Sequence, residues 1–149
     1  MKFSLAAVTL VLAVASSTCD AAFDVKKVLA AARSQIGVPY VWGGGHGPRP
    51  GRTKGGFDCS GLVRFAVFRG SGIDLGRGGN TDSQLRDRHT TQIACSRLQP
   101  GDLIFWGKQS DTHHVALYSG NNKMIEAPRT GLRVREIKYR KADICARVR

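Results

Sequence analysis

The sequence predicts a single α+β domain in which helices from the first half of the chain pack on an antiparallel β-sheet. Two patterns carry this prediction. Helical periodicity and capping residues occur before residue 90, whereas short strand-like segments separated by tight turns follow Leu98. Helices followed by a run of closely spaced strands are typical of an antiparallel α+β architecture. The 149 residues, 42% of them hydrophobic, suffice for one domain with its own core.

Three segments carry helix signals. The segment 24–36 (DVKKVLAAARSQI) begins with Asp24, which can cap a helix, and is rich in alanine. A second helix is expected directly after Asp58, another capping residue, and the Gly-Ser-Gly segment at 70–72 should end it. Residues 80–88 (NTDSQLRDR) predict a short third helix behind an Asn or Thr cap.

Strand signals fill the second half of the chain. The SGNNK segment (119–123) predicts a hairpin turn. Residues 43–56 (GGGHGPRPGRTKGG), in the first half, lack hydrophobic periodicity, so we expect them to form a mobile surface loop. Segments bounded by turn residues predict strands at 103–106, 114–118, 123–126, 132–139 and about 144–148.

The N-terminal residues 1–21 have the pattern of a secretory signal peptide. Lys2 provides the positive start, residues 5–14 form an apolar stretch too short to span a bilayer, and small residues follow. Cleavage after Ala15 or after Ala21 fits the pattern, and we prefer the later point, which leaves residues 22–149 as the folded domain. We therefore expect a secreted or periplasmic protein with no lipid or membrane anchor.

Removal of this segment leaves three cysteines, Cys59, Cys95 and Cys145, in an oxidising compartment. Three thiols allow one pair and leave one over. From its position alone, Cys59 could be a buried apolar residue, half of a disulfide, a metal ligand or a nucleophile. The chain has no CxxC pair and no HxxxH spacing, which disfavours a zinc site, and we expect neither a metal nor a cofactor.

Cys59 is the first residue of the helix expected after Asp58. The unpaired N–H groups and the positive dipole end of a first turn favour a thiolate, and they can bind the oxyanion formed when sulfur attacks a carbonyl. Gly61 should keep this turn open to a substrate backbone. This placement suits a nucleophile, although a cysteine at the start of a helix is more often simply buried.

A thiol nucleophile needs a histidine that takes and returns protons. His46 lies in the Gly/Pro-rich loop and His89 in a polar segment, so we expect both on the solvated surface. In THHVALY the side chains alternate between two faces, so only one of His113 and His114 can point at the helix. Glu126, near the end of the next strand, is suited to orient an imidazole. Each of these residues alone is more often a solvated polar group, and it is their combination that favours catalysis.

Four motifs in order resemble the NlpC/p60 cysteine peptidases of cell-wall metabolism: PYVWGG, GFDCSGLV, LQPGDLIFW and HVALYSGNNKMIEAP. The resemblance runs from about residue 26 to the C-terminus. It implies a papain-like fold, with N-terminal helices packed on an antiparallel sheet. It also implies hydrolysis of amide bonds in peptidoglycan stem peptides, most often between γ-D-glutamate and a diamino acid such as diaminopimelate or lysine.

Position by position, the resemblance assigns Cys59 as the nucleophile and His114 as the general base. Tyr40, Asp58 and Ser60 fall on positions that line the substrate pocket in the family and often grip the free amino end of the stem peptide.

The third catalytic position departs from the commoner family pattern, because Glu126 stands where a second histidine is usual. A carboxylate can also orient His114 and stabilise its imidazolium, so we expect a Cys59–His114–Glu126 triad. With Cys59 assigned by the resemblance, we expect Cys95 and Cys145 to form a disulfide that holds the C-terminus. The loop 43–56 looks longer and more basic than is usual in the family, which leaves the substrate preference open.

The formal net charge of +12, from 23 Lys plus Arg against 11 Asp plus Glu, favours an anionic partner. Residues 129–149 hold eight basic and two acidic side chains, a net +6, which is either a solvated sheet face or a surface attracted to anionic cell walls. The chain has no nucleic-acid-binding motif and no aromatic stacking platform. We therefore expect peptidoglycan stem peptides and the wall surface as partners, no nucleic acid, and a monomer.

The sequence leaves two alternative functions open. One is an N-acetylmuramoyl-L-alanine amidase, which would cut a different bond of the same wall. The other is a non-catalytic, cationic wall-binding or antimicrobial protein on the same fold.

Overall fold

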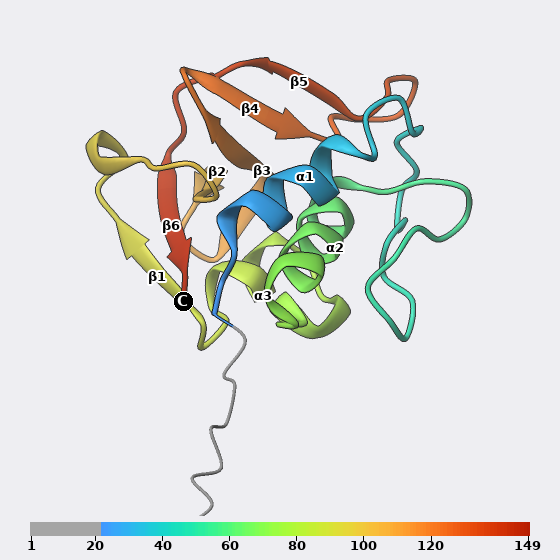
Figure 1. Cartoon of the computed structure of the whole chain (residues 1–149), viewed down its shortest axis with the longest axis horizontal. Helices are drawn as coiled ribbons and strands as arrows, with labels where there is room; N and C mark the ends of the chain where they lie inside the picture. The colour runs from blue at the N-terminus through green and yellow to red at the C-terminus, as the bar shows by residue number, and fades with distance from the viewer. Residues whose placement is uncertain (1–21) are drawn as a thin grey trace, which may run out of the picture.

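The computed structural model describes residues 22–149, so the predicted signal peptide lies outside the described residues. Within them, three α-helices group together and pack against a six-stranded antiparallel sheet (Figure 1). This arrangement confirms the predicted α+β class. None of the helices in residues 22–149 has the length and apolar character needed to cross a bilayer.

The helices begin at the capping residues that the sequence indicates. The side chain of Asp24 accepts a hydrogen bond from the Lys27 amide, and that of Asn80 accepts one from Ser83. The second helix is capped by Asp58 and ends at Gly72, whose left-handed backbone (φ 75°) suits a residue without a side chain. The helical segments are α1 (Val25–Arg33), α2 (Cys59–Ser71), the 3₁₀ segment η1 (Leu75–Gly78), α3 (Thr81–Leu85) and the 3₁₀ segment η2 (Cys95–Arg97).

The sheet has the strand order β1-β6-β2-β3-β4-β5, and all neighbours pair antiparallel. A tight turn through Asn121 and Asn122, both with positive φ, joins β3 and β4 as the SGNNK segment predicts. The strands are β1 (Thr90–Ile93), β2 (Leu103–Lys108), β3 (Asp111–Gly120), β4 (Lys123–Glu126), β5 (Arg135–Lys138) and β6 (Ile144–Val148).

Strand β1 was not predicted from the sequence. Its residues TTQI are polar or partly exposed, and they show no buried alternation. The strand exists because it pairs with β6, with Thr90 opposite Val148 and Ile93 opposite Cys145. A pairing over this sequence distance leaves no local signal in the strand itself.

The two faces of the sheet bury different clusters. Val115 and Leu117 of β3 belong to the larger cluster, which includes the apolar residues of α1 and α2. Ala116, on the opposite face, belongs to a smaller cluster with Ile104 and Met124. The sheet thus carries the helices on one face and the smaller apolar cluster on the other.

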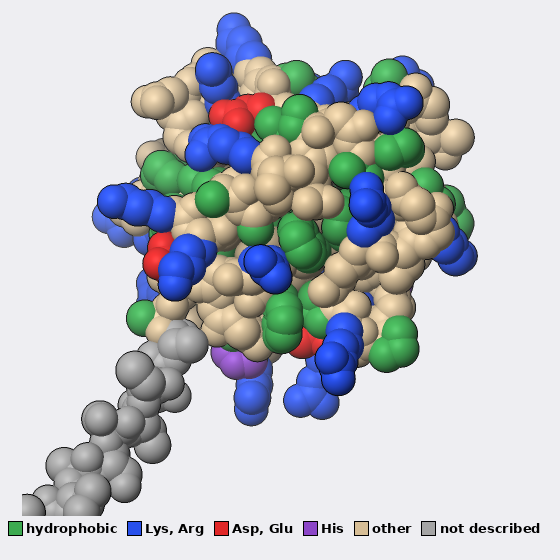
Figure 2. Space-filling model, turned by 45° about the vertical axis from the view of Figure 1, so that its right-hand side comes forward, with side chains coloured by type: hydrophobic (Ala, Val, Ile, Leu, Met, Phe, Trp, Pro, Cys, Tyr) green, Lys and Arg blue, Asp and Glu red, His purple; other side chains and the backbone are tan. Residues whose placement is uncertain are grey.

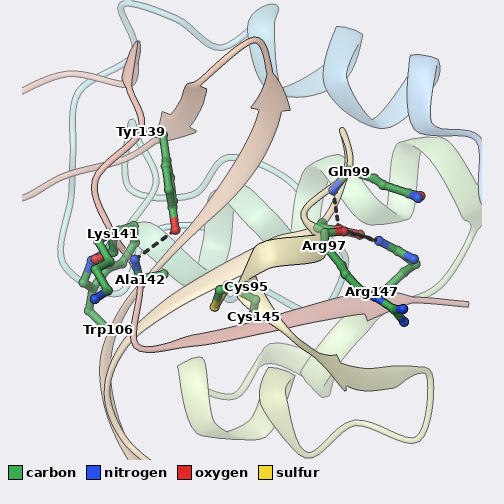
Figure 3. The surroundings of a disulfide bond; sticks show 10 residues. Cys95, Arg97, Gln99, Trp106, Tyr139, Lys141, Ala142, Cys145 and Arg147 are labelled. Atoms are coloured by element: carbon green, nitrogen blue, oxygen red, sulfur yellow. Dashed lines mark hydrogen bonds and ion pairs between the residues drawn. A yellow bond between two sulfur atoms is a disulfide. The ribbon is translucent and has the colours of Figure 1, made fainter.

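Cys95 and Cys145 form a disulfide, the pair expected from the sequence, with Cα atoms 5.2 Å apart (Figure 3). It links the η2 turn to β6, which pairs with both β1 and β2. In the same region the Arg147 guanidinium donates to the buried Asp102 carboxylate at 2.7 and 2.8 Å. The last strand is therefore held to the rest of the sheet by a covalent bond and by an ion pair.

Basic side chains are spread over the face shown in Figure 2, with few acidic groups among them. The C-terminal basic run is not simply a solvated surface. Arg147 pairs with Asp102, and both Arg135 and Arg140 pair with the buried Glu126. Part of the +6 charge of residues 129–149 therefore neutralises carboxylates inside the fold.

Removing the disulfide should destabilise the protein. The Cys95→Ala/Cys145→Ala double variant should lose about 2–4 kcal/mol of unfolding free energy, because the cross-link restricts the unfolded chain. Urea unfolding followed by circular dichroism measures this difference. Wild-type protein kept in reductant provides the control and should match the double variant, whereas equal midpoints for all three samples would contradict a stabilising role.

Candidate active site

Cys59 is the first residue of α2, directly after the capping residue Asp58. One carboxylate oxygen of Asp58 accepts from the Gly61 amide at 2.7 Å, and the other accepts from the Gly43 amide at 3.2 Å. Asp58 therefore closes the first turn of the helix and ties it to the loop that follows Trp42. Asp58 also directly precedes Cys59, which is the only free cysteine among the described residues.

Gly61 has a different role from the one predicted. A Cβ atom at this position would collide with the carbonyl oxygen of Gly44 and the Cα atom of Gly45. The space expected to admit a substrate backbone is therefore filled by the protein's own loop, and a glycine is required because the loop packs directly on the helix.

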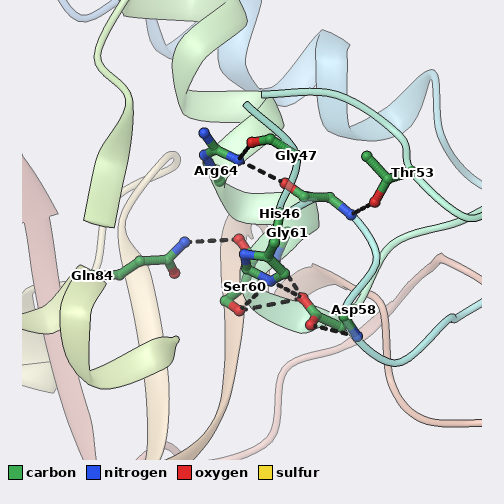
Figure 4. Close-up of polar contacts among 10 residues, drawn as sticks. His46, Gly47, Thr53, Asp58, Ser60, Gly61, Arg64 and Gln84 are labelled. Carbon is green, nitrogen blue, oxygen red and sulfur yellow. Dashed lines mark hydrogen bonds and ion pairs between the residues drawn. The ribbon is translucent and has the colours of Figure 1, made fainter. Parts of the chain in front are cut away.

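His46 was predicted to lie on the solvated surface, and this prediction was wrong. Its Nε2 atom lies 2.7 Å from the Asp58 carboxylate and 3.2 Å from the Ser60 hydroxyl, and the ring is mostly buried (Figure 4). The loop is folded against α2 because the buried guanidinium of Arg64 donates to the carbonyls of Gly45 and Gly47. Composition alone suggested a mobile loop, whereas these long-range hydrogen bonds hold its first turn in place.

The three predicted substrate-binding residues meet at one cavity. Tyr40, Asp58 and Ser60 line a hollow of about 630 Å³ together with Cys59 and His46. The exposed Trp42 also lines this cavity, together with residues 78–81, Thr112 and His113. The cavity thus combines a thiol, a carboxylate, a phenol and an imidazole.

Burial raises the pKa of the Cys59 thiol to about 11, and the neighbouring Asp58 carboxylate adds to this shift. Hydrogen bonding from the backbone near Val115, Ser60 and Cys59 itself acts in the opposite direction but is the smaller effect. The sequence predicted that the helix N-terminus would favour a thiolate. In the folded protein desolvation outweighs the helix end, so the free protein holds a thiol at neutral pH.

Burial, followed by the charges of Cys59 and Asp58, also raises the pKa of Tyr40, to about 12. The phenol therefore keeps its proton at neutral pH. It is available as a hydrogen-bond donor in the cavity that contains the thiol.

His114 and Glu126 form a close pair. The Nε2 atom of His114 lies 2.7 Å from one carboxylate oxygen of Glu126, whose side chain is fully buried. The His114 ring also packs on Trp106, with ring centroids 5.1 Å apart. The carboxylate fixes the ring orientation and leaves Nδ1 as the nitrogen that can act on another group.

Two arginines complete the surroundings of Glu126. Arg135 donates to its carboxylate at 2.9 and 3.1 Å, and Arg140 donates at 3.0 and 3.1 Å. Burial by itself would raise the pKa of Glu126, but the hydrogen bonds from His114, Arg140 and Arg135 outweigh it and lower the pKa to about 2. Glu126 is therefore an anion at every pH at which the protein would work.

The structure assembles the predicted residues in two groups. Tyr40, Asp58 and Ser60 surround Cys59, whereas Glu126 holds His114 beside a second cavity of about 450 Å³. No hydrogen bond joins the Cys59 thiol and the His114 ring in the described part of the chain. The two groups meet at a bulge in β3, where Thr112 and His114 pair with adjacent residues of β2 and His113 is the extra residue. The exposed His113 lines both cavities.

Sequence reasoning missed His46 and Arg64 as parts of the site. The only signal for His46 was a histidine among glycines shortly before the cysteine helix, and Arg64 looked like an ordinary helical residue. Residues 22–149 contain no group of three His, Cys, Asp or Glu side chains that could hold a metal ion.

The comparisons with known proteins point to one family. The NlpC/P60 family model matches residues 37–147. Peptidoglycan endopeptidase RipA of Mycobacterium tuberculosis is 44% identical over 117 residues, which make up 74% of this chain and 24% of RipA. The chain thus spans about a quarter of the length of that relative.

Solved structures give the same result. The NlpC/p60 domain of the peptidoglycan hydrolase SagA superposes with a TM-score of 0.72 at 34% identity, covering 84% of this chain and 99% of the domain. RipA structures superpose with a TM-score of 0.68 at 41% identity, over 84% of this chain and 61% of theirs, and include forms mutated at a cysteine, a histidine or a glutamate. RipD of M. tuberculosis, described as a non-catalytic NlpC/p60 domain protein adapted to peptidoglycan binding, has a TM-score of 0.65 at 33% identity, covering 84% and 95%.

Replacing Glu126 should destabilise the fold in a pH-dependent way. At neutral pH, Glu126→Gln should cost about 2–3 kcal/mol, because it leaves two arginines without their partner while their exposed edges stay hydrated. The lowered pKa of Glu126 means that its charge stabilises the fold fully above pH 4.5 and that this contribution is lost as the pH falls through about 2. The difference in unfolding free energy between wild type and variant should therefore shrink from pH 6 to pH 2.5 in urea titrations. A difference that is the same at both pH values would contradict the assignment.

The raised pKa of Cys59 makes a prediction for its reactivity. Only the thiolate reacts with iodoacetamide, so the alkylation rate of the free protein should rise about tenfold per pH unit below the pKa and still increase between pH 8 and pH 10. Mass spectrometry measures the rate, and Cys59→Ala is the control that should take up no label. A plateau between pH 6 and pH 8 would instead indicate a resting thiolate–imidazolium pair.

Proposed function

Because the chain belongs to the NlpC/P60 family, we propose that it is a secreted cysteine endopeptidase that cleaves the stem peptides of peptidoglycan. The observation that carries this proposal is the oriented His114–Glu126 pair on β3 and β4. Helix α2, which begins at the free Cys59, packs against β3. RipA and SagA, named as a peptidoglycan endopeptidase and a peptidoglycan hydrolase, support the substrate class.

A spacing in RipA supports the choice of His114 over His113. The histidine and the glutamate that are mutated in the RipA structures lie twelve positions apart, as do His114 and Glu126. A glutamate at the third catalytic position is also not unique to this chain, because one of the RipA structures carries a mutation at a glutamate. Cys59, His114 and Glu126 are then nucleophile, base and orienting carboxylate.

The proposed reaction begins with a protonated thiol, in line with the raised pKa of Cys59. His114 removes the proton as sulfur attacks the carbonyl carbon of the stem-peptide amide. The Cys59 amide and the Tyr40 hydroxyl donate to the oxyanion, for which Tyr40 is suited because it keeps its proton. His114 then protonates the leaving amine, and water attacks the thioester to release the acid and restore the thiol.

The cavity beside Cys59 suits the acyl part of such a substrate. The Asp58 carboxylate and the Ser60 hydroxyl offer acceptors for the free amine of a stem peptide. This arrangement favours cleavage of the bond between γ-D-glutamate and the diamino acid. The γ-carbonyl of that bond is one dipeptide, L-Ala-γ-D-Glu, away from the free amine. An N-acetylmuramoyl-L-alanine amidase would need the glycan where this amine is held.

Two observations favour peptidoglycan binding without catalysis as the second candidate function. RipD combines this fold with a binding role, and in the present chain the partly buried Cys59 makes no hydrogen bond to His114 among the described residues. A protein that only binds would retain affinity for muropeptides and release no new amino groups.

Single substitutions separate these functions. Cys59→Ala should lower kcat for a defined muropeptide by at least about 10⁴-fold, since it removes the nucleophile, and His114→Ala should lower it by about 10²–10⁴-fold, since it removes the general base. His113→Ala is the matched control on the adjacent position and should retain most of the activity. Chromatography and mass spectrometry of the digested muropeptide give both the rate and the bond cut.

Three outcomes would contradict the proposal. Turnover retained by folded Cys59→Ala would exclude the thiol mechanism, and a wild type that binds muropeptides but cleaves none would favour the binding function. Loss of activity in His113→Ala but not in His114→Ala would move the base to the neighbouring position.

A further inference from the structure

The cavity beside His114 differs in charge from the cavity beside Cys59. Arg129, Arg135 and Arg140 line it, and its only carboxylate is that of Glu126. Three guanidinium groups against one carboxylate leave two positive charges. One positive charge is enough to neutralise the buried Glu126 carboxylate. The excess positive charge therefore faces the open volume of about 450 Å³.

The guanidinium groups retain donors that point to no protein acceptor. Arg135 uses Nε and one terminal nitrogen on Glu126, and Arg140 uses its two terminal nitrogens there. Each guanidinium has five N–H groups, so N–H groups of both remain. The exposed side chain of Arg129 donates no hydrogen bond to any group of residues 22–149. The cavity therefore presents several cationic donors at one place.

The donors of Arg135 and Arg140 are held in place before any ligand arrives. The guanidinium carbon of Arg140 lies 5.0 Å from the centroid of the Trp106 ring, over its face. The Glu126 carboxylate forms ion pairs with both Arg135 and Arg140. A planar guanidinium fixed in this way loses little freedom when it binds, and its geometry matches a carboxylate. Two of the three guanidinium groups at the cavity are therefore positioned in advance for an anion.

We infer that this arginine cavity is a subsite for a carboxylate on the leaving side of the cleaved bond, so that the protein selects stem peptides with diaminopimelate over those with lysine. The inference rests on the proposed endopeptidase function. The two cavities meet at His113, with Asp58 in one and the arginines in the other. A stem peptide with its amine at Asp58 and its reacting carbonyl at Cys59 directs its diamino acid toward the arginines. Diaminopimelate carries a carboxylate at the end of the side chain, and lysine lacks it.

A matched pair of substrates tests this assignment. The tripeptides L-Ala-γ-D-Glu-diaminopimelate and L-Ala-γ-D-Glu-L-Lys differ only in that carboxylate. Wild-type protein should cleave the first with kcat/KM about tenfold or more above the second, the value of one charge-assisted hydrogen bond. Arg129→Gln should bring this ratio toward one. It leaves the Glu126 contacts intact, unlike substitution of Arg135 or Arg140.

Arg69→Gln is the control variant, because Arg69 is an exposed arginine in the last turn of α2, at the end of the helix away from Cys59. Its ratio should equal that of wild type. Equal kcat/KM for the two peptides, or a preference for diaminopimelate that Arg129→Gln leaves unchanged, would overturn the carboxylate subsite while the endopeptidase function stands.

Binding to the Cys59→Ala variant separates the inference from the proposed function. Isothermal titration with the two peptides should give a lower Kd for the diaminopimelate form, and Arg129→Gln in the same background should remove the difference. If wild type cleaves neither peptide, the endopeptidase function fails and the Kd ratio still decides whether the subsite exists. Equal Kd values would overturn the subsite.

Discussion

The Asp58 carboxylate is the group on which the rest of the site depends. It accepts hydrogen bonds from the amides of Gly61 and Gly43 and from the His46 ring, so it caps α2 and fastens the loop to the helix at once. The first turn of α2 then presents Cys59 directly after this carboxylate. This position has a chemical consequence, since the same charge that organises the turn opposes ionisation of the thiol. A thiol in such surroundings depends on an external base.

Glu126 has the corresponding role on the sheet. It orients His114, and its burial is tolerated because Arg135 and Arg140 from the C-terminal segment neutralise it. The cationic tail of the sequence is thus partly an internal structural feature. The disulfide and the Arg147–Asp102 pair attach the strand β6, which follows these arginines, to the rest of the protein. The C-terminal residues therefore support the histidine side of the site as the loop 43–56 supports the cysteine side.

The elements with local signals were predictable. Caps at Asp24, Asp58 and Asn80 begin helices as expected, and alternating apolar residues mark the central strands. Errors arose where a distant contact decides. Strand β1 has no pattern of its own and forms by pairing with β6. The loop containing His46 looked mobile because composition does not reveal that Arg64 binds its carbonyls.

The sequence by itself determined the fold class, the family and the identity of the candidate catalytic residues, because capping, periodicity and motif order are local properties that a chain carries before it folds. Only the tertiary structure decided the electrostatics. Whether Cys59 is a thiol or a thiolate depends on desolvation, and whether the arginines form a solvated surface or an anion cavity depends on which carboxylates lie against them. Both properties are sums over groups far apart in sequence, so they exist only after the chain has brought those groups together.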